Sequence, residues 1–180
     1  MKKDICKKIE IPLGINVNID GGLIFVEGPE GKLSKKFDLR KINLRKEGNL
    51  IVVEAKKATK KEKRLINTLV SHIKNMISGV MKKFEYKLKI CFSHFPISVE
   101  IKEKEALIKN FLGEKTPRKV KILEGVEVSV DKEIITIRSP SKELAGQMAA
   151  DFEMSTRIKS KDRRIFQDGI WIINKAGKDI

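Results

Sequence analysis

Two short stretches of the sequence collect basic side chains that could bind phosphate groups. The first surrounds the turn at 110–122, "NFLGEKTPRKVKI", and the second occupies 157–164. Lys and Arg neutralise phosphates and release their counterions, so such clusters on loops are typical of nucleic-acid contact. The candidate residues are Lys109, Gly113, Lys115, Arg118, Lys119 and Lys121 in the first stretch, and Arg157, Lys159, Lys161, Arg163 and Arg164 in the second.

The first stretch has turn residues that suit a close approach to a ligand. Gly113 has no side chain to keep the backbone away, and Pro117 stiffens the turn, so less entropy would be lost on binding. The alternative for both stretches is solvated surface charge that keeps the protein soluble. That alternative applies more strongly to the run 56–64, "KKATKKEKR", because lysine-rich helix entries are common in soluble proteins.

The whole chain is strongly basic. Its 39 Lys and Arg against 24 Asp and Glu leave a net charge of +15, which favours a polyanionic partner. No apolar run approaches the roughly 18 residues of a membrane span, and "MKKDICKK" lacks the apolar core of a signal peptide, so we expect a cytoplasmic protein. Aromatic residues make up only 6% of the chain, which favours backbone and shape contacts with structured RNA over base stacking.

The residue types that carry enzyme chemistry do not form a recognisable pattern. Neither His72 nor His94 has a serine, cysteine or carboxylate pattern around it that suggests a catalytic triad. "GPEG" followed by Lys32 lacks the spacing of a phosphate-binding loop and leads into a strand. Cys6 and Cys91 are far apart and form no CxxC motif. We therefore expect no enzymatic activity, no metal site and no cofactor.

The elements that must position the basic stretches are short strands and two helices. Thr59 and Glu62 have capping-box spacing, and apolar residues then recur with helical period up to Val80. Alternating apolar residues and turn signals predict strands in the first half at 15–19, 23–27, 32–39, 49–55 and 84–92.

The same pattern then recurs in the second half. "ISVEI" at 97–101 corresponds to "INVNI" at 15–19, and "IITI" at 134–137 corresponds to "LIVV" at 50–53. A second helix is predicted with Ser139 as N-cap and Pro140 at the first helical position. The final "IFQDGIWIIN" corresponds in this scheme to the strand after the first helix.

This duplication predicts an α+β fold of two tandem, internally duplicated domains. Each is a small antiparallel sheet packed against one helix. The predicted domains are 1–94 and 95–180, with a boundary near His94–Pro96.

Five motifs follow one another along nearly the whole chain, namely "IEIPLGINVNIDGGLIFVEGPEGKL", "TLVSHIKNMISGV", "HFPI", "NFLGEK" and "DRRIFQDGIWI". In this order they resemble the ribosomal protein L6 family in its archaeal and eukaryotic branch. Two positions depart from the family pattern, since Trp171 stands where tyrosine is expected and Leu13 replaces a usual acidic residue.

The resemblance implies a structural constituent of the large ribosomal subunit. Such a protein would bind 23S-type rRNA near the sarcin-ricin loop, beside the landing site of translational GTPases, with its second domain making most RNA contacts. The resemblance places Gly113, Lys115, Arg118, Lys119 and the second basic stretch against RNA. The implied partners are rRNA and neighbouring ribosomal proteins, without a membrane, a small-molecule substrate or an obligate homo-oligomer.

Two other functions stay open at this point. A free-standing RNA-binding regulator of translation would carry the same basic loops. A hydrolase would depend on one of Glu114, Asp162 or Asp168, although "QDG" at 167–169 is more typical of a turn.

Overall fold

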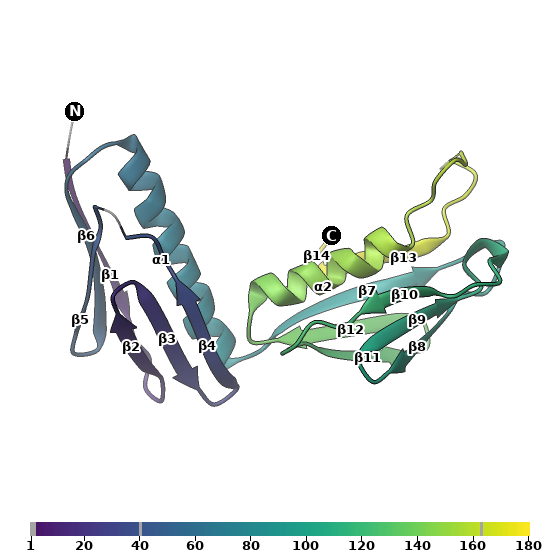
Figure 1. Cartoon of the computed structure of the whole chain (residues 1–180), viewed down its shortest axis with the longest axis horizontal. Helices are drawn as coiled ribbons and strands as arrows, with labels where there is room; N and C mark the ends of the chain where they lie inside the picture. The colour runs from purple at the N-terminus through teal and green to yellow at the C-terminus, as the bar shows by residue number, and fades with distance from the viewer. Residues whose placement is uncertain (1–2, 40, 163) are drawn as a thin grey trace. The chain divides into compact units, whose positions relative to one another are not determined.

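The computed structural model describes residues 3–39, 41–162 and 164–180. The chain forms two compact units, one up to Lys83 and one from Phe84 onwards (Figure 1). Both units combine antiparallel sheets with one helix, which confirms the predicted α+β class.

The first unit contains two three-stranded sheets and a long helix. The antiparallel sheets have the strand orders β1-β6-β5 and β2-β3-β4. The elements are β1 (Lys3–Glu10), β2 (Asn16–Asp20), β3 (Leu23–Gly28), β4 (Gly31–Lys36), β5 (Asn43–Glu47), β6 (Leu50–Ala58) and α1 (Lys60–Met81).

Helix α1 begins where the sequence predicts. Thr59 is the N-cap, its backbone N–H donates to Glu62 Oε2 at 2.8 Å, and its hydroxyl oxygen accepts from Lys61 N at 3.3 Å. The buried face includes Ile66 and Ile73, both fully buried in the core of this unit. Leu65, at the margin of the apolar stripe, stays 49% exposed.

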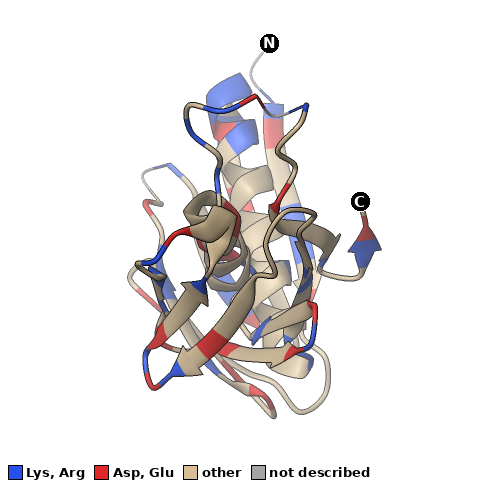
Figure 2. Cartoon of the chain, turned by 90° about the vertical axis from the view of Figure 1, so that its right-hand side faces the viewer, with Lys and Arg blue, Asp and Glu red and all other residues tan. Residues whose placement is uncertain are grey.

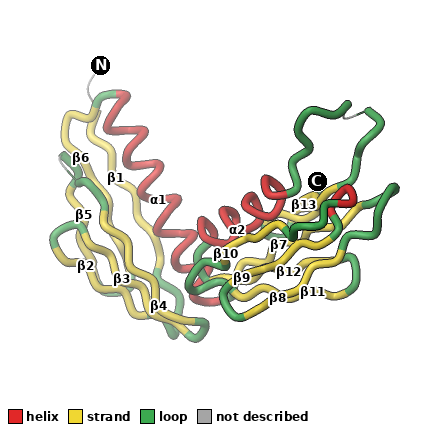
Figure 3. Tube along the Cα trace, turned by 45° about the vertical axis from the view of Figure 1, so that its right-hand side comes forward, coloured by secondary structure: helices red, strands yellow, loops and turns green. Residues whose placement is uncertain are grey.

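The second unit contains a five-stranded sheet, a three-stranded sheet and a shorter helix. The strand orders are β11-β12-β7-β13-β14 and β10-β9-β8. Figure 3 shows a long loop between α2 and β13. The elements are β7 (Phe84–Cys91), β8 (Ser98–Lys102), β9 (Glu105–Lys109), a 3-10 turn (Phe111–Gly113), β10 (Arg118–Lys121), β11 (Glu127–Asp131), β12 (Ile134–Ser139), α2 (Lys142–Ser155), β13 (Gly169–Lys175) and β14 (Lys178–Asp179).

The duplication is visible in the strand order. The orders β1-β6-β5 and β2-β3-β4 of the first unit recur as β7-β12-β11 and β8-β9-β10 in the second. The helices also correspond, since α1 follows β6 and α2 follows β12. Strands β13 and β14 are an addition to the second copy among the described residues.

The position of β7 corrects the expected domain boundary near residue 95. Strand β7 pairs with β12 on one side and with β13 on the other, so Leu88 lies opposite both Ile135 and Ile172. Its hydrogen bonds therefore belong to the second unit, and the division falls after Lys83. The strand corresponds to β1, so its expected equivalence with "IFQDGIWIIN" is wrong.

The start of α2 also differs from the prediction. The N-cap is Ser141, whose side chain accepts from Leu144 N at 3.3 Å, and not Ser139. Ser139 is the last residue of β12 and is buried, and its hydroxyl donates to Gly125 O at 2.9 Å. Ser141 has the extended backbone of an N-cap, with φ of −91° and ψ of 114°, so the helix begins two residues later than predicted.

The capping box of α1 gives a prediction about stability. Thr59→Ala should lower the free energy of unfolding by about 1 kcal/mol, because the first helical turn loses a side-chain hydrogen-bond partner. Thr68→Ala is the control, since Thr68 is exposed within the same helix. Urea unfolding followed by far-UV circular dichroism measures both, and equal effects of the two variants would contradict the role of the cap.

Candidate RNA interface

The first basic stretch forms a tight turn between β9 and β10. Asn110, Leu112 and Gly113 have left-handed backbones, with φ of 58°, 50° and 78°. Phe111 between them is buried and fixes the turn to the core of the second unit. The turn is thus a rigid projection with one apolar anchor.

The turn is also fastened to the segment that follows β7. The Asn110 side-chain amide donates to Pro96 O at 3.0 Å. A Cβ atom added to Gly113 would lie 3.3 Å from Cζ of Phe95, so the backbone passes closely over that ring. The glycine is therefore needed both for its φ and for this close approach.

Arg118 is the centre of a network inside the protein. Its Nε donates to Glu114 Oε2 at 2.8 Å and its Nη2 to Glu114 Oε1 at 2.5 Å. Its Nη1 donates to Ser155 O at 2.6 Å, at the end of α2, and its guanidinium lies 4.2 Å from the centroid of the Phe111 ring. The hydrogen bonds from Arg118 hold the pKa of Glu114 below its usual range. Arg118 therefore joins the turn to the helix end.

The second basic stretch lies on the loop between α2 and β13, which returns to the sheet at a buried carboxylate. Asp168 is 1% exposed and accepts from Ser93 N at 2.7 Å, Ser93 Oγ at 2.9 Å and His94 Nδ1 at 3.0 Å. Burial raises the pKa of Asp168, but the hydrogen bonds from Ser93 and His94 lower it more, so the carboxyl titrates below its ordinary value.

Thr156 anchors the other end of the same loop. Its hydroxyl accepts from Ile170 N at 3.0 Å and lies 3.3 Å from Glu153 O, to which it can donate. This side chain joins the end of α2 to the start of β13. Together with Asp168 it holds both ends of the loop.

Aromatic contacts link the loop to the segment after β7 and to a basic residue. The rings of His94 and Phe166 stack with a centroid separation of 4.8 Å. Lys161 Nζ lies 4.5 Å from the centroid of Phe166, and its charge also lowers the pKa of Glu114 on the turn. Arg118 of the first stretch also donates to Ser155 O, two residues before Arg157, so the structure brings the two basic stretches together although some forty residues separate them in the sequence.

Some of the basic side chains predicted to bind RNA have partners within the protein, and others have none in the described part of the chain. Lys109 pairs with Glu100 at 2.5 Å, and Lys119 pairs with Glu105 at 3.5 Å. Arg163 lies outside the described residues. Figure 2 shows Lys and Arg along the loop after α2. The exposed residues whose side chains make no hydrogen bond or ion pair within the described part of the chain are Lys115, Lys121, Arg157, Lys159 and Arg164.

Sequence reasoning missed the role of Ser93, His94 and Asp168. Their contact joins residues 74 and 75 positions apart, and no local pattern indicates it. The trio is not a proton relay, because the same His94 Nδ1 approaches both Ser93 Oγ, at 3.1 Å, and Asp168, whereas a relay uses opposite ring nitrogens. It is a structural clasp.

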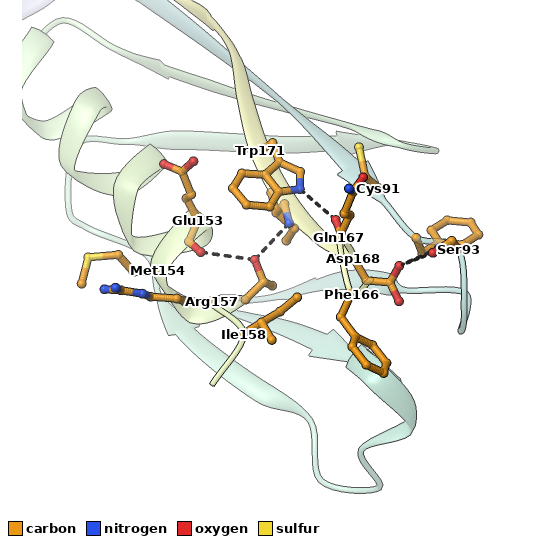
Figure 4. A pocket seen from close by; sticks show the side chains of 13 residues that line it. Cys91, Ser93, Glu153, Met154, Arg157, Ile158, Phe166, Gln167, Asp168 and Trp171 are labelled. Carbon is orange, nitrogen blue, oxygen red and sulfur yellow. Dashed lines mark hydrogen bonds between the residues drawn. The ribbon is translucent and has the colours of Figure 1, made fainter. Parts of the chain in front are cut away.

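A hollow with a volume of about 770 Å³ lies beside this clasp (Figure 4). Its walls come from the end of β7, the last turn of α2, the loop and the start of β13. Within the described residues, no group of His, Cys, Asp and Glu side chains could hold a metal ion. None of the described helices has the length and apolarity to cross a membrane.

Comparison with known proteins identifies the family. The model of the family described as "Ribosomal protein L6" matches residues 11–83 and 95–169. A relative from Staphylothermus marinus, named large ribosomal subunit protein uL6, is 46% identical over 172 residues, which cover 93% of each chain. The proteins of the same name from Nanoarchaeum equitans and Methanococcus vannielii are 44% and 42% identical, covering 96% and 97% of this chain and 94% and 96% of their own.

These matches confirm the resemblance seen in the motifs. Members of this family are structural components of the cytoplasmic ribosome and not enzymes, which excludes a hydrolase built on Glu114, Asp162 or Asp168. The chain, with its two duplicated units and a match over most of its length, belongs to the ribosomal protein L6 family.

Proposed function

We propose that the chain is a structural component of the large ribosomal subunit, attached to 23S-type rRNA mainly through the two basic stretches of its second unit. The observation that carries the proposal is that both stretches project from one rigid frame. Arg118, at the start of β10, donates to Ser155 O at the end of α2, and the loop that carries Arg157 and Lys159 begins directly after Ser155. One RNA surface can then meet both.

The internal contacts that hold the loop and the turn reduce the entropy lost on RNA binding. Asp168, Thr156 and Phe111 order the loop and the turn in the protein itself. Side chains and loops that are already ordered lose less conformational entropy on association. The exposed Lys and Arg then provide charge at defined positions, and each neutralised phosphate releases counterions.

The basic residues divide between two roles in this proposal. Lys115, Arg157, Lys159 and Arg164 contact phosphates directly, because their side chains are exposed and unused within the described structure. Arg118 positions the turn, because most of its donors are occupied by Glu114 and Ser155.

The proposed location follows from the family resemblance. At the proposed location, the second unit binds near the sarcin-ricin loop, beside the landing site of translational GTPases, with other ribosomal proteins as neighbours. The names of the relatives specify the large subunit and support that part of the proposal. The net charge of +15 agrees with a site within a polyanion.

Sedimentation of a lysate through a sucrose gradient at moderate salt tests the proposed function. The protein should migrate with large subunits and intact ribosomes and should stay there through a salt wash, because many phosphate contacts act together. Recovery in light fractions alone would contradict the proposal and would favour the free-standing RNA-binding regulator.

The loop after α2 gives a prediction about salt dependence. Replacing Arg157 and Lys159 together by Gln should weaken binding to deproteinised large-subunit rRNA and lower the slope of log K against log salt by roughly 1.4–1.8, since each lost phosphate contact removes about 0.7–0.9. Filter binding at several salt concentrations measures the slope.

Lys178→Gln is the control for this experiment. Lys178 is exposed on β14, which pairs with the far end of β13, whereas the loop joins β13 at Gly169. Its replacement should leave the slope within about 0.3 of the wild type, because Lys178 lies away from the loop. The control removes one charge and the loop variant removes two, so an equal loss for each charge removed would mean that net charge, and not the loop, determines binding.

The hydrogen bonds of Arg118 predict that its substitution affects RNA affinity and the salt slope differently from the loop variant. Arg118→Lys keeps the charge but loses the two-pronged contact with Glu114 and the bond to Ser155 O. RNA affinity should fall while the salt slope stays nearly constant, because the frame is disturbed and no phosphate contact is removed. Arg118→Gln removes the charge as well, and a loss of about one unit of slope in that variant would instead identify Arg118 as a phosphate ligand.

A further inference from the structure

The hollow beside the clasp has an exposed aromatic wall. Trp171 on β13 is 46% exposed, and its Nε1–H donates to Gln167 O at 3.3 Å, which fixes the ring orientation (Figure 4). Phe92 and Met154 are 41% and 65% exposed at the same hollow. Large apolar side chains that are held in place and left open to solvent indicate a surface for a ligand.

The polar groups deep in the hollow are already satisfied. The Asp168 carboxylate faces Ser93 and His94, and the Thr156 hydroxyl is bonded to β13 and to α2. Among the described residues, no buried side-chain polar atom lacks a hydrogen-bond partner. The hollow therefore offers mainly apolar and aromatic contact to whatever enters it.

Electrostatics decide which part of an RNA fits. The acidic residues Glu153 and Asp168 line the hollow together with Arg157, so the interior is less favourable for a phosphate than the basic loop outside it. Arg157 lies at the hollow, and Lys159 follows two residues later on the loop, where phosphates would be attracted. An uncharged planar group flanked by phosphates matches this arrangement.

We propose that the hollow receives one unstacked base of the bound RNA, which stacks on the indole of Trp171 while the adjoining phosphates contact Arg157 and Lys159. The volume of about 770 Å³ lies within the range of small-ligand sites and accommodates a base with its ribose. Bases that are splayed out of RNA are commonly held on aromatic side chains. This inference rests on the proposed RNA-binding function and adds to it a single position of base contact.

The fluorescence of Trp171 tests the proposal directly, because it is the single tryptophan of the chain. Deproteinised large-subunit rRNA is titrated into the full chain at moderate salt, and binding is measured in parallel by filter retention. Emission should be quenched in proportion to the bound fraction, because a stacked base contacts the indole.

The results distinguish a failure of the base site from a failure of the proposed RNA-binding function. Retention of RNA on the filter with unchanged emission would overturn the base site and leave the proposed function standing. Failure to bind rRNA at all would contradict the proposed function itself. Emission that is unchanged by rRNA but altered after addition of the other large-subunit proteins would mean that a protein fills the hollow, which also overturns the base site.

Substitution of the indole gives an independent test. Trp171→Leu should weaken rRNA binding by roughly 5- to 150-fold, because the stacking contact is lost. The salt slope should stay unchanged, because the phosphate contacts remain. Trp171→Phe keeps an aromatic face and should retain most of the affinity. Binding of the Leu variant equal to wild type, or equal losses for Leu and Phe, would contradict stacking.

Phe25→Leu is the matched control. Phe25 is an aromatic residue of the first unit that is 43% exposed, close to the exposure of Trp171. Its replacement should not change rRNA affinity. Thermal unfolding of every variant by far-UV circular dichroism separates a loss of stacking from a loss of folded protein, and a folded Phe25 variant with the same deficit as Trp171→Leu would overturn the proposal.

Discussion

The buried carboxylate of Asp168 is the contact on which the candidate interface depends. It accepts three hydrogen bonds from Ser93 and His94, and so joins the segment after β7 to the start of β13. Burying this carboxylate without hydrogen-bond partners would cost free energy, so the buried position of Asp168 requires Ser93 and His94. Because the loop after α2 ends at this residue, the position of its basic side chains, and the shape of the hollow, follow from the clasp.

The basic residues near the Asp168 contact fall into two groups. Some bind other parts of the protein, and others are left exposed for a partner. Arg118 uses a planar guanidinium to join Glu114, Phe111 and the end of α2, a geometry that lysine cannot reproduce. Exposed residues such as Arg157 and Lys159 have no such internal partners within the described structure. A count of basic residues treats the two groups alike, although only the second adds directly to counterion release.

The duplication explains why the second unit carries these features. Both units repeat the same strand orders with one helix, so the repeated part supplies a stable core in each. The second copy adds β13 and β14 to the edge of its sheet and spans the gap from α2 with a long loop. The clasp, the second basic stretch and the hollow depend on this addition, whereas the first basic stretch lies on the turn between β9 and β10, in the repeated part.

The sequence by itself determined both helices, many of the strands, the duplication, the family and the two basic stretches, because alternation, capping residues and charge are encoded within a few neighbouring positions. Thr59 and Glu62 predicted the start of α1 for this reason. The strands at Lys3–Glu10 and Asn43–Glu47 were not predicted. Tertiary structure decided that β7 belongs to the second unit, that Arg118 bonds Ser155 and that Asp168 bonds Ser93. These contacts join residues 37 to 75 positions apart in the chain, and their partners are selected by packing and by the cost of burying unpaired polar groups, which no local pattern records.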